Sequence, residues 1–305
     1  MAEEPATPLV SVVVATNRGG PYLHEALASV AAQTYARIEV LVVDDGSPDP
    51  AALREITDRF PGVQVLRIEP SGVSAARNLG VTRTHGALLA FLDDDDRWHP
   101  ERVARHVERM AAQPSAVVSY CAMRTIDSTG RELVAADQRA APEQVDVVRG
   151  PGVMLPNLVI RRDVYDEIGG FDPAYRQGED LDLVLRAAAL GPFAFVDDVL
   201  VDYRHHATNT TRSHRDLATS IRTIVGRHRD AARTAGKGAL VTAYDERLRA
   251  NDRFAAWSAV RAARQHLRDR RLGRALAEIG WAVRFAPDVP VSWARARTGR
   301  HARSR

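Results

Sequence analysis

The first ninety or so residues of the chain alternate between two kinds of apolar pattern. Four short, continuous apolar runs have the pattern of buried strands: residues 9–15, 38–43, 63–68 and 87–92. Three segments between them carry apolar residues at helical spacing: residues 22–33, 51–60 and 71–84. Strands that are apolar on both faces and alternate with helices predict a parallel sheet covered by helices on both sides.

The pattern is looser after residue 92. Further strands are expected at residues 117–126, 131–134, 158–160, 193–196 and 199–203. Further helices are expected at residues 100–112, 163–168 and 180–190. Residues 135–150 have little periodicity, and we expect them to form a surface loop.

Four consecutive aspartates, Asp93 to Asp96, directly follow the fourth apolar run. Four adjacent carboxylates repel one another, and a bound cation would neutralise them. A solvated acidic turn is the simpler interpretation of such a run. Ligands of open α/β sheets, however, bind where the strands end, so the position favours a metal site.

A second acidic pair, Asp44 and Asp45, ends the second apolar run. A carboxylate there can accept hydrogen bonds from a nucleotide, although an ordinary helix cap explains the pair equally well. Residues 71–74 open the next helix, whose first amides are suited to face an anion. Arg77, one turn further on, can pair with the acidic strand ends or form a structural ion pair.

Several classes of site are excluded by what the sequence lacks. Residues 16–21 follow the first strand without the G-x-G-x-x-G pattern, and no P-loop pattern occurs. The only lysine is Lys237, and the only cysteine is Cys121, which excludes an internal disulfide and a cysteine-rich zinc site. A phosphate-bearing ligand would therefore be bound through arginines, helix ends or a divalent ion held by carboxylates.

Charge is distributed unevenly along the chain. Residues 1–206 hold 20 basic and 31 acidic residues, whereas residues 207–305 hold 22 basic and 8 acidic residues. This change predicts a domain of residues 1–206 followed by a basic segment of residues 207–305, with a loop at 208–211. Within the basic segment, helices are expected at residues 217–229, 239–249, 254–267 and 272–285.

The N-terminal residues carry Glu3 and Glu4 and lack the order of a signal peptide. No apolar run approaches the roughly 20 residues that span a bilayer. We therefore expect a soluble, cytoplasmic protein, with peripheral membrane contact as an option for its basic segment.

The order of motifs resembles the inverting glycosyltransferases of family 2. The matching segments are residues 10–14, 28–35, 38–47, 75–80, 91–96, 169–172, 178–183 and 203–206. The resemblance covers about residues 9–206. It implies a GT-A-type nucleotide-diphospho-sugar transferase fold, with a mostly parallel central sheet flanked by helices. The C-terminal extension, residues 207–305, lies outside the resemblance and is expected to be all-helical.

The resemblance also implies a function and roles for individual residues. The expected enzyme moves a hexosyl group from a nucleoside-diphosphate sugar to an acceptor hydroxyl with inversion. The implied nucleotide-binding residues are Ala15, Thr16, Asp44, Asp45, Arg77, Asp93 and Asp94. The implied ligands of Mn²⁺ or Mg²⁺ are Asp93 and Asp95 of the D-x-D motif, with Asp96 and His206. Asp180 matches the catalytic base, with Glu179 beside it.

One motif departs from the family. The first strand ends in Ala15-Thr16-Asn17-Arg18, where the family usually reads Pro-Thr-Tyr-Asn. Because the aromatic residue is missing, uridine, thymidine and guanosine nucleotides all stay open as the donor's base.

Other functions and partners stay open from the sequence. The alternatives are a sugar nucleotidyltransferase and a non-catalytic nucleotide-sugar-binding scaffold. The acceptor is a carbohydrate, a lipid-linked molecule or a small molecule with a hydroxyl group. The basic helices either pack as an appendage with a solvated face or contact an anionic membrane, and no nucleic-acid partner is expected.

Overall fold

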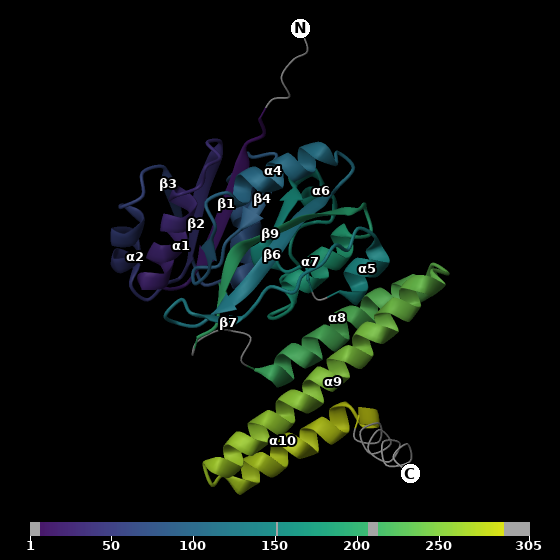
Figure 1. Cartoon of the computed structure of the whole chain (residues 1–305). Coiled ribbons are helices and arrows are strands. Elements are labelled where there is room, and N and C mark those ends of the chain that lie inside the picture. Colours follow the sequence, from purple (N-terminus) through teal and green to yellow (C-terminus); the bar gives the residue numbers. More distant parts are fainter. Residues whose placement is uncertain (1–6, 151, 207–212, 290–305) are drawn as a thin grey trace. The chain divides into compact units, whose positions relative to one another are not determined.

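The computed structural model describes residues 7–150, 152–206 and 213–289 (Figure 1). The chain forms two compact units, residues 1–209 and 210–305. The loop predicted at residues 208–211 lies outside the described residues.

The first half of the central sheet is parallel, as the sequence predicts. Its strands are β1 (Val10–Thr16), β2 (Ile38–Asp45), β3 (Val63–Ile68) and β4 (Leu88–Phe91). They lie in the order β3-β2-β1-β4, and every neighbouring pair is parallel. Their carboxyl ends therefore meet at one edge of the sheet, which brings the acidic strand ends together.

Three helices connect these strands: α1 (Pro21–Ala31), α2 (Pro50–Thr57) and α3 (Val73–Thr82). Proline is the first residue of α1 and of α2, where its missing N–H has no helical partner. The Asp49 side chain caps α2 by accepting a hydrogen bond from the Ala52 amide at 3.0 Å. The predicted alternation of strands and helices is thus confirmed over this half.

The second half of the sheet is mixed. Its strands are β5 (Arg97–Trp98), β6 (Val118–Ile126), β7 (Glu132–Val134), β8 (Leu158–Arg161) and β9 (Phe193–Arg204). Strand β8 runs antiparallel between β4 and β6, β9 runs parallel to β6, and β5 pairs antiparallel with β9. The sheet is thus less uniformly parallel than expected, within the mixed α/β architecture that the sequence predicts.

The helices of this half are α4 (Arg102–Ala112), α5 (Gln144–Arg149), α6 (Arg162–Glu167) and α7 (Glu179–Ala187), with a 3₁₀ turn at Leu155–Asn157. Two predictions are wrong here. Residues 144–149 form α5 within the predicted loop, and the two strands predicted at 193–203 are a single strand, β9. Its register against β6 shifts near Cys121 and Ala122, so the polar residues between the two runs do not end it.

The core occupies both faces of the sheet because successive strand residues point to opposite sides. Val13 and Phe91 belong to one buried cluster, whereas Val12, Val14 and Ala90 belong to the other. This double burial explains why the strand sequences are continuously apolar. It also makes the sheet a rigid base for the residues at its edge.

The C-terminal unit consists of α8 (His214–Thr234), α9 (Gly238–Arg268) and α10 (Leu272–Phe285). Helix α9 packs against both α8 and α10. The prediction of two helices at residues 239–267 is wrong, because the polar residues between them belong to one helix. Asn251 donates a hydrogen bond to the Ala218 carbonyl of α8 at 2.9 Å, and Asp252 pairs with Arg222 at 2.5 Å. Among the described residues, none of the helices combines the length and apolar character needed to span a membrane.

Candidate active site

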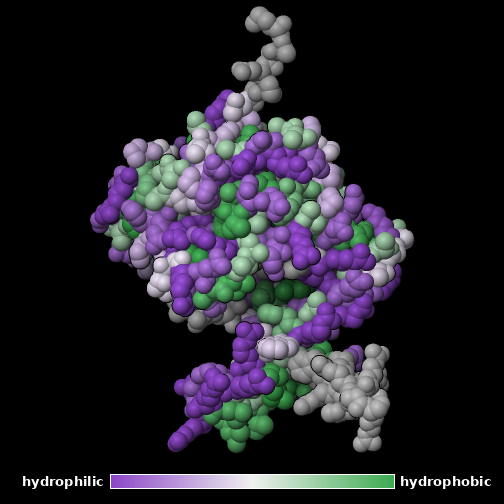
Figure 2. Space-filling model, in the orientation of Figure 1, coloured by the Kyte–Doolittle hydropathy of each residue, from purple (hydrophilic) through white to green (hydrophobic). Residues whose placement is uncertain are grey.

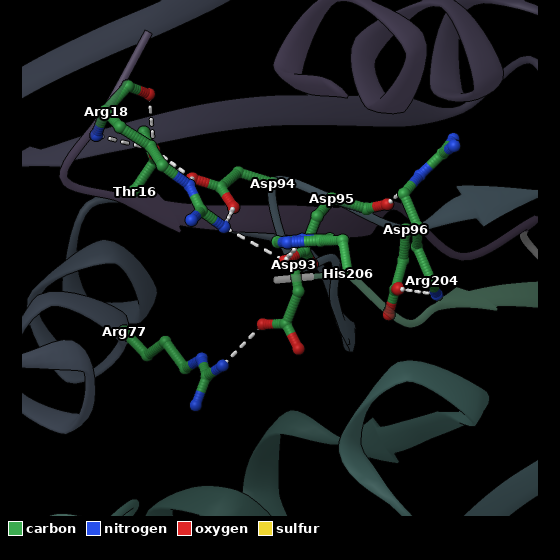
Figure 3. A network of polar contacts seen from close by, with 9 residues as sticks. All are labelled: Thr16, Arg18, Arg77, Asp93, Asp94, Asp95, Asp96, Arg204 and His206. Carbon is green, nitrogen blue, oxygen red and sulfur yellow. Dashed lines mark hydrogen bonds and ion pairs between the residues drawn. The ribbon is translucent and has the colours of Figure 1, made fainter. Parts of the chain in front are cut away.

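The carboxyl edge of the parallel half of the sheet collects most of the predicted site residues (Figure 3). Thr16 ends β1, Asp44 and Asp45 end β2, and the acidic run of Asp93 to Asp96 follows β4. The chain reaches this edge at three adjacent strands. The edge therefore combines residues that are about eighty positions apart in the sequence.

The four carboxylates of the acidic run point to different partners. Asp93 pairs with Arg77, and Asp94 contacts the Thr16 hydroxyl and the Arg18 guanidinium. Figure 3 shows these side chains diverging from one another instead of converging on one point.

The other two carboxylates of the run face the end of β9. Asp95 Oδ2 lies 2.8 Å from His206 Nε2 and 2.9 Å from Arg18 Nη2. Asp96 Oδ1 accepts a hydrogen bond from the Arg204 amide at 2.8 Å. Arginine and histidine side chains of the chain itself thus offset part of the repulsion within the run. Repulsion persists at Asp95 and Asp96, whose pKa values are raised by burial and by the neighbouring aspartates.

Arg77 connects the acidic run with the start of α7. Its Nη2 atom lies 2.5 Å from Asp93 Oδ1, and its Nη1 atom lies 2.8 Å from Glu179 Oε1. The Arg77 side chain is only 6% exposed. A buried guanidinium with two carboxylate partners has a fixed position, so it holds the β4 end and the α7 start together.

Glu179 and Asp180 occupy the first turn of α7. This helix begins after Gly178, whose φ of 78° is favourable for glycine. Burial raises the pKa of Asp180, and Asp93 raises it further, while the Leu181 amide and Arg77 act in the opposite direction. Burial and the neighbouring Asp180 raise the pKa of Glu179, against the effect of Arg77. A carboxylate with a raised pKa is a better proton acceptor than an ordinary surface aspartate.

Asp44 and Asp45 have separate roles in the structure. Asp44 is buried, accepts a hydrogen bond from the Ser47 amide at 2.7 Å and pairs with Arg67. Asp45 accepts hydrogen bonds from the Ser71 amide at 2.6 Å and the Gly72 amide at 2.9 Å. The amides that precede α3 thus do face an anion, and that anion is the Asp45 carboxylate.

The end of β1 contributes Ala15 and Thr16. Ala15 is half-buried, lies in register with Val43 and packs against the core. Thr16 is buried, and its Oγ1 atom accepts a hydrogen bond from the Arg18 amide at 3.1 Å. The turn after β1 is thereby closed so that Arg18 reaches the acidic run.

The donor atoms at this edge suit a divalent metal in kind. Asp95 and Asp96 are buried, and burial together with Asp93 raises the pKa of each. Asp96 Oδ2 is buried and has no hydrogen-bond partner among the residues that the structure describes. Carboxylate groups are ordinary ligands of Mn²⁺ and Mg²⁺. Within the described ranges, however, no group of three or more acidic, histidine or cysteine side chains is already arranged around one point.

Two arginines at the site were not among the predicted residues. Arg18 Nη2 lies 2.8 Å from Asp94 Oδ1 and 2.9 Å from Asp95 Oδ2. Arg204 is fully buried, donates from Nε to the Asp95 carbonyl at 2.9 Å and pairs with Glu25 at 2.6 Å. The signal for Arg18 was the departure from the family pattern at residues 15–18. The departure removes an aromatic residue, which the prediction of the donor's base takes into account. It also adds the positive charge of Arg18, which the predicted site does not include.

Comparisons with known proteins agree on one family. The family model described as Glycosyl transferase family 2 matches residues 11–169. An uncharacterized glycosyltransferase of Rickettsia prowazekii is 28% identical over 68% of this chain and 67% of its own length. An uncharacterized glycosyltransferase of Nostoc sp. is 29% identical over 67% of each chain. Glycosyltransferase AglE of Haloferax volcanii is 29% identical over 63% of this chain and 66% of its own length.

A solved structure shares the fold. The crystal structure of S. aureus TarS 1–349 in complex with UDP-GlcNAc superimposes with a TM-score of 0.60 and 18% identity. The superposition covers 89% of this chain and 90% of that chain. Together with the family match, it confirms the predicted GT-A-type fold.

Proposed function

The chain belongs to glycosyl transferase family 2, and we propose that it moves a sugar from a nucleoside-diphosphate sugar to an acceptor hydroxyl with inversion. Its class is that of a glycosyltransferase, as for the named relatives. Inversion requires direct displacement at the anomeric carbon, with the acceptor attacking from the face opposite the leaving diphosphate. No covalent intermediate with the enzyme is needed.

The Arg77 bridge is the observation that carries this proposal. It joins Asp93, on the side of the acidic run, to Glu179, next to Asp180. A donor whose diphosphate lies at the acidic run therefore has its anomeric carbon near the first turn of α7. A base and a leaving group on opposite sides of one carbon are the requirement for inversion.

Asp180 is proposed as the general base. An acceptor hydroxyl has a high pKa, so its proton must be removed as the new bond forms. The raised pKa of Asp180 suits this role, and its place on the rigid first turn of α7 fixes its direction. Glu179, held by Arg77, positions the turn without itself taking the proton.

A divalent ion, Mn²⁺ or Mg²⁺, is proposed as the cofactor. Asp93, Asp95 and His206 would hold it, with the unpartnered oxygen of Asp96 as a further candidate. When bound, such an ion stabilises negative charge on the leaving diphosphate as a Lewis acid. Arg18 and Arg77 already place positive charge at the same edge and help to bind the diphosphate.

The donor is proposed to lie across the ends of β1, β2 and β4. Its nucleotide would contact the set Ala15, Thr16, Asp44, Asp45, Arg77, Asp93 and Asp94. Asp45 serves this site by holding the Ser71–Gly72 turn against the end of β2. The TarS complex with UDP-GlcNAc supports a nucleotide sugar as the donor, and the acceptor is a carbohydrate, lipid-linked or small-molecule hydroxyl.

Thermal unfolding with a panel of donors tests the proposal. UDP, dTDP and GDP sugars, UDP-GlcNAc included, are added with Mn²⁺ or with a chelator. One donor class should raise the unfolding temperature, and the rise should shrink in chelator. Stabilisation by nucleoside triphosphates alone would indicate a nucleotidyltransferase instead.

Turnover of the stabilising donor then tests the base. Asp180→Asn should keep the donor-induced thermal shift and lose at least about 100-fold in nucleoside diphosphate release. Asp166→Asn, on the neighbouring helix α6, is the matched control and should retain parental turnover. Parental turnover in Asp180→Asn, or a product with the donor's anomeric configuration, would contradict the mechanism.

A further inference from the structure

Helix α10 presents a continuous stripe of exposed apolar side chains. Leu272, Leu276, Ile279 and Val283 are 62%, 64%, 41% and 49% exposed. Their spacing of four, three and four residues places them on one face of the helix. The small residues Ala275 and Ala282 on an adjacent face are buried, so the stripe is not the face through which α10 packs.

Helix α9 adds to this exposed apolar surface. Trp257 and Leu267 are 61% and 53% exposed, and α9 packs along α10. Leu267 and Leu272 flank the short turn between the two helices. Leu267 therefore adjoins the N-terminal end of the stripe. A continuous exposed apolar surface marks an interaction site more often than scattered single residues do.

The segment that carries the stripe is rich in positive charge. Residues 253–284 contain eight arginines against two acidic residues, a balance of +6. One of the two acids, Glu278, is already paired with Arg215 at 2.9 Å and lies 3.1 Å from His214. All eight arginines are exposed. On the C-terminal unit in Figure 2, hydrophobic surface lies directly beside strongly hydrophilic surface.

We infer that the face formed by the α10 stripe and the adjoining residues of α9 docks on an anionic lipid surface. The apolar side chains would enter the boundary between headgroups and acyl chains, while the arginines contact lipid phosphates. A second copy of the chain is a poorer occupant, since two such faces would bring like charges together. The inference is independent of the proposed sugar transfer and identifies the partner of a surface outside the catalytic unit.

Vesicle flotation of the full-length protein tests the inference. The vesicles consist of phosphatidylcholine alone or of phosphatidylcholine with about one third phosphatidylglycerol, at low and high salt. Binding to the anionic vesicles should exceed binding to the neutral vesicles at least about tenfold and weaken with salt. Equal binding to both vesicles, or binding to neither, would overturn the inference.

Two double variants separate the contributions of charge and apolar contact. Arg268→Gln with Arg271→Gln, next to the exposed Leu267 and Leu272, should weaken binding about 30-fold, because each arginine near an anionic surface contributes about fivefold. Leu272→Gln with Leu276→Gln should weaken it at least about tenfold. These residues are exposed, so unfolding temperatures should stay close to that of the parent.

Matched controls lie on the catalytic unit. Leu133 and Val134 are 47% and 58% exposed, and Arg54 and Arg83 are also exposed. Their changes to glutamine should leave vesicle binding as in the parent. If the α10 variants bind like the parent, the inference is wrong. Light scattering tests whether a second copy of the chain binds this face instead. If Leu272→Gln with Leu276→Gln turns a dimer into a monomer and leaves vesicle binding unchanged, the face binds a second copy and the inference is wrong.

Discussion

Arg18 contacts two acidic residues of the candidate site, although it is absent from the site residues that the sequence predicts. Its guanidinium contacts both Asp94 and Asp95, and His206 contacts the same oxygen of Asp95 as Arg18 does. If Asp95 holds the proposed metal ion, Arg18 competes with that ion for the carboxylate. The same guanidinium would offer a positive group to the diphosphate of the proposed donor.

Arg18→Gln is expected to strengthen Mn²⁺ binding in the absence of donor by about tenfold. The reason is that Arg18 lies within hydrogen-bond distance of Asp95, the proposed metal ligand, so removing its positive charge removes repulsion of the ion. Solvent reduces this effect, because the Arg18 side chain is partly exposed. Titration calorimetry of the free protein with Mn²⁺ measures this effect without any turnover. Arg59→Gln, in a surface pair with Glu55, is the control. Unchanged or weaker metal binding in Arg18→Gln would show that Arg18 does not compete.

The sequence predicts well which residues lie at this edge of the sheet. It predicts poorly which side chains form hydrogen bonds and ion pairs with them. The acidic run and the Asp44–Asp45 pair were located from strand ends, because strand direction fixes where those residues lie. Their partners depend on which side chain reaches across from another element, as Arg67 reaches Asp44. Such contacts leave no periodic trace in the sequence.

At the scale of elements, α3 shows how closely helices approach the sheet. A Cβ atom added at Gly80 would lie 2.6 Å from Val13 Cγ1 and 3.1 Å from Val43 Cγ2. Glycine is therefore needed at this point of the helix for packing, although it lowers helix propensity. The close approach sets the position of α3 and, through it, the position of Arg77.

Gly80→Ala is expected to destabilise the protein by about 1–3 kcal/mol, because the added methyl group overpacks the contact with β1 and β2. Gly226→Ala, in the middle of α8, is the matched control. No atom lies within 4 Å of the added methyl group there, so a gain of about 0.5–1 kcal/mol is expected. Thermal and denaturant unfolding of both variants measure the two effects. A neutral or stabilising Gly80→Ala would show that α3 can shift away from the sheet.

Helix α4 contains a buried titratable group, the imidazole ring of His106. Its Nδ1 atom lies 2.9 Å from Ser119 Oγ of β6, and the ring is fully buried. Burial lowers the pKa of His106 well below its usual value, and the neighbouring Arg102 lowers it further. The native protein therefore keeps this ring neutral under mildly acidic conditions.

The contribution of His106 to the free energy of unfolding is expected to fall as the pH drops below about 6.5, whereas buried carboxylates with raised pKa values, such as Asp96, contribute in the opposite direction. In the unfolded chain His106 binds a proton near this pH, whereas in the native chain it does not. As the pH falls, the unfolded state therefore binds a proton before the native state does. This lowers the free energy of unfolding by up to about 1.4 kcal/mol per pH unit. His106→Asn should remove this contribution, whatever its effect at about pH 7, so the difference in stability between variant and parent should change with pH. Unfolding curves of both proteins between about pH 7.5 and about 5.5 measure this difference. Parallel pH profiles for variant and parent would contradict the assignment.

Elements defined by local pattern were predicted well, and elements defined by distant pairing were not. The strands and helices of residues 9–92 follow from their own apolar spacing. Strand β5 has only the residues Arg97 and Trp98 and exists because β9 pairs with them. Likewise, α9 continues through Asn251 and Asp252 because α8 binds their side chains, which no single-segment pattern reveals.

At the scale of the whole molecule, the acidic candidate site and the basic, apolar helices belong to different units of the chain. The unit of residues 1–209 contains the acidic edge, and the unit of residues 210–305 contains the basic and apolar helices. If the first unit transfers sugar and the second binds an anionic lipid surface, changes in one should leave the other's property intact. This independence is itself a testable consequence.

The variant Arg268→Gln with Arg271→Gln should therefore keep the parental thermal shift with donor and the parental rate of nucleoside diphosphate release in solution. Asp180→Asn should show the reverse, with vesicle binding within about twofold of the parent and turnover strongly reduced. The two assays are measured on the same protein preparations. A loss of donor binding in the arginine variant would show that the basic helices serve the catalytic site directly. With both expectations met, anionic vesicles should raise transfer to a lipid-linked acceptor and leave transfer to a water-soluble acceptor unchanged, because only the former is concentrated at the surface.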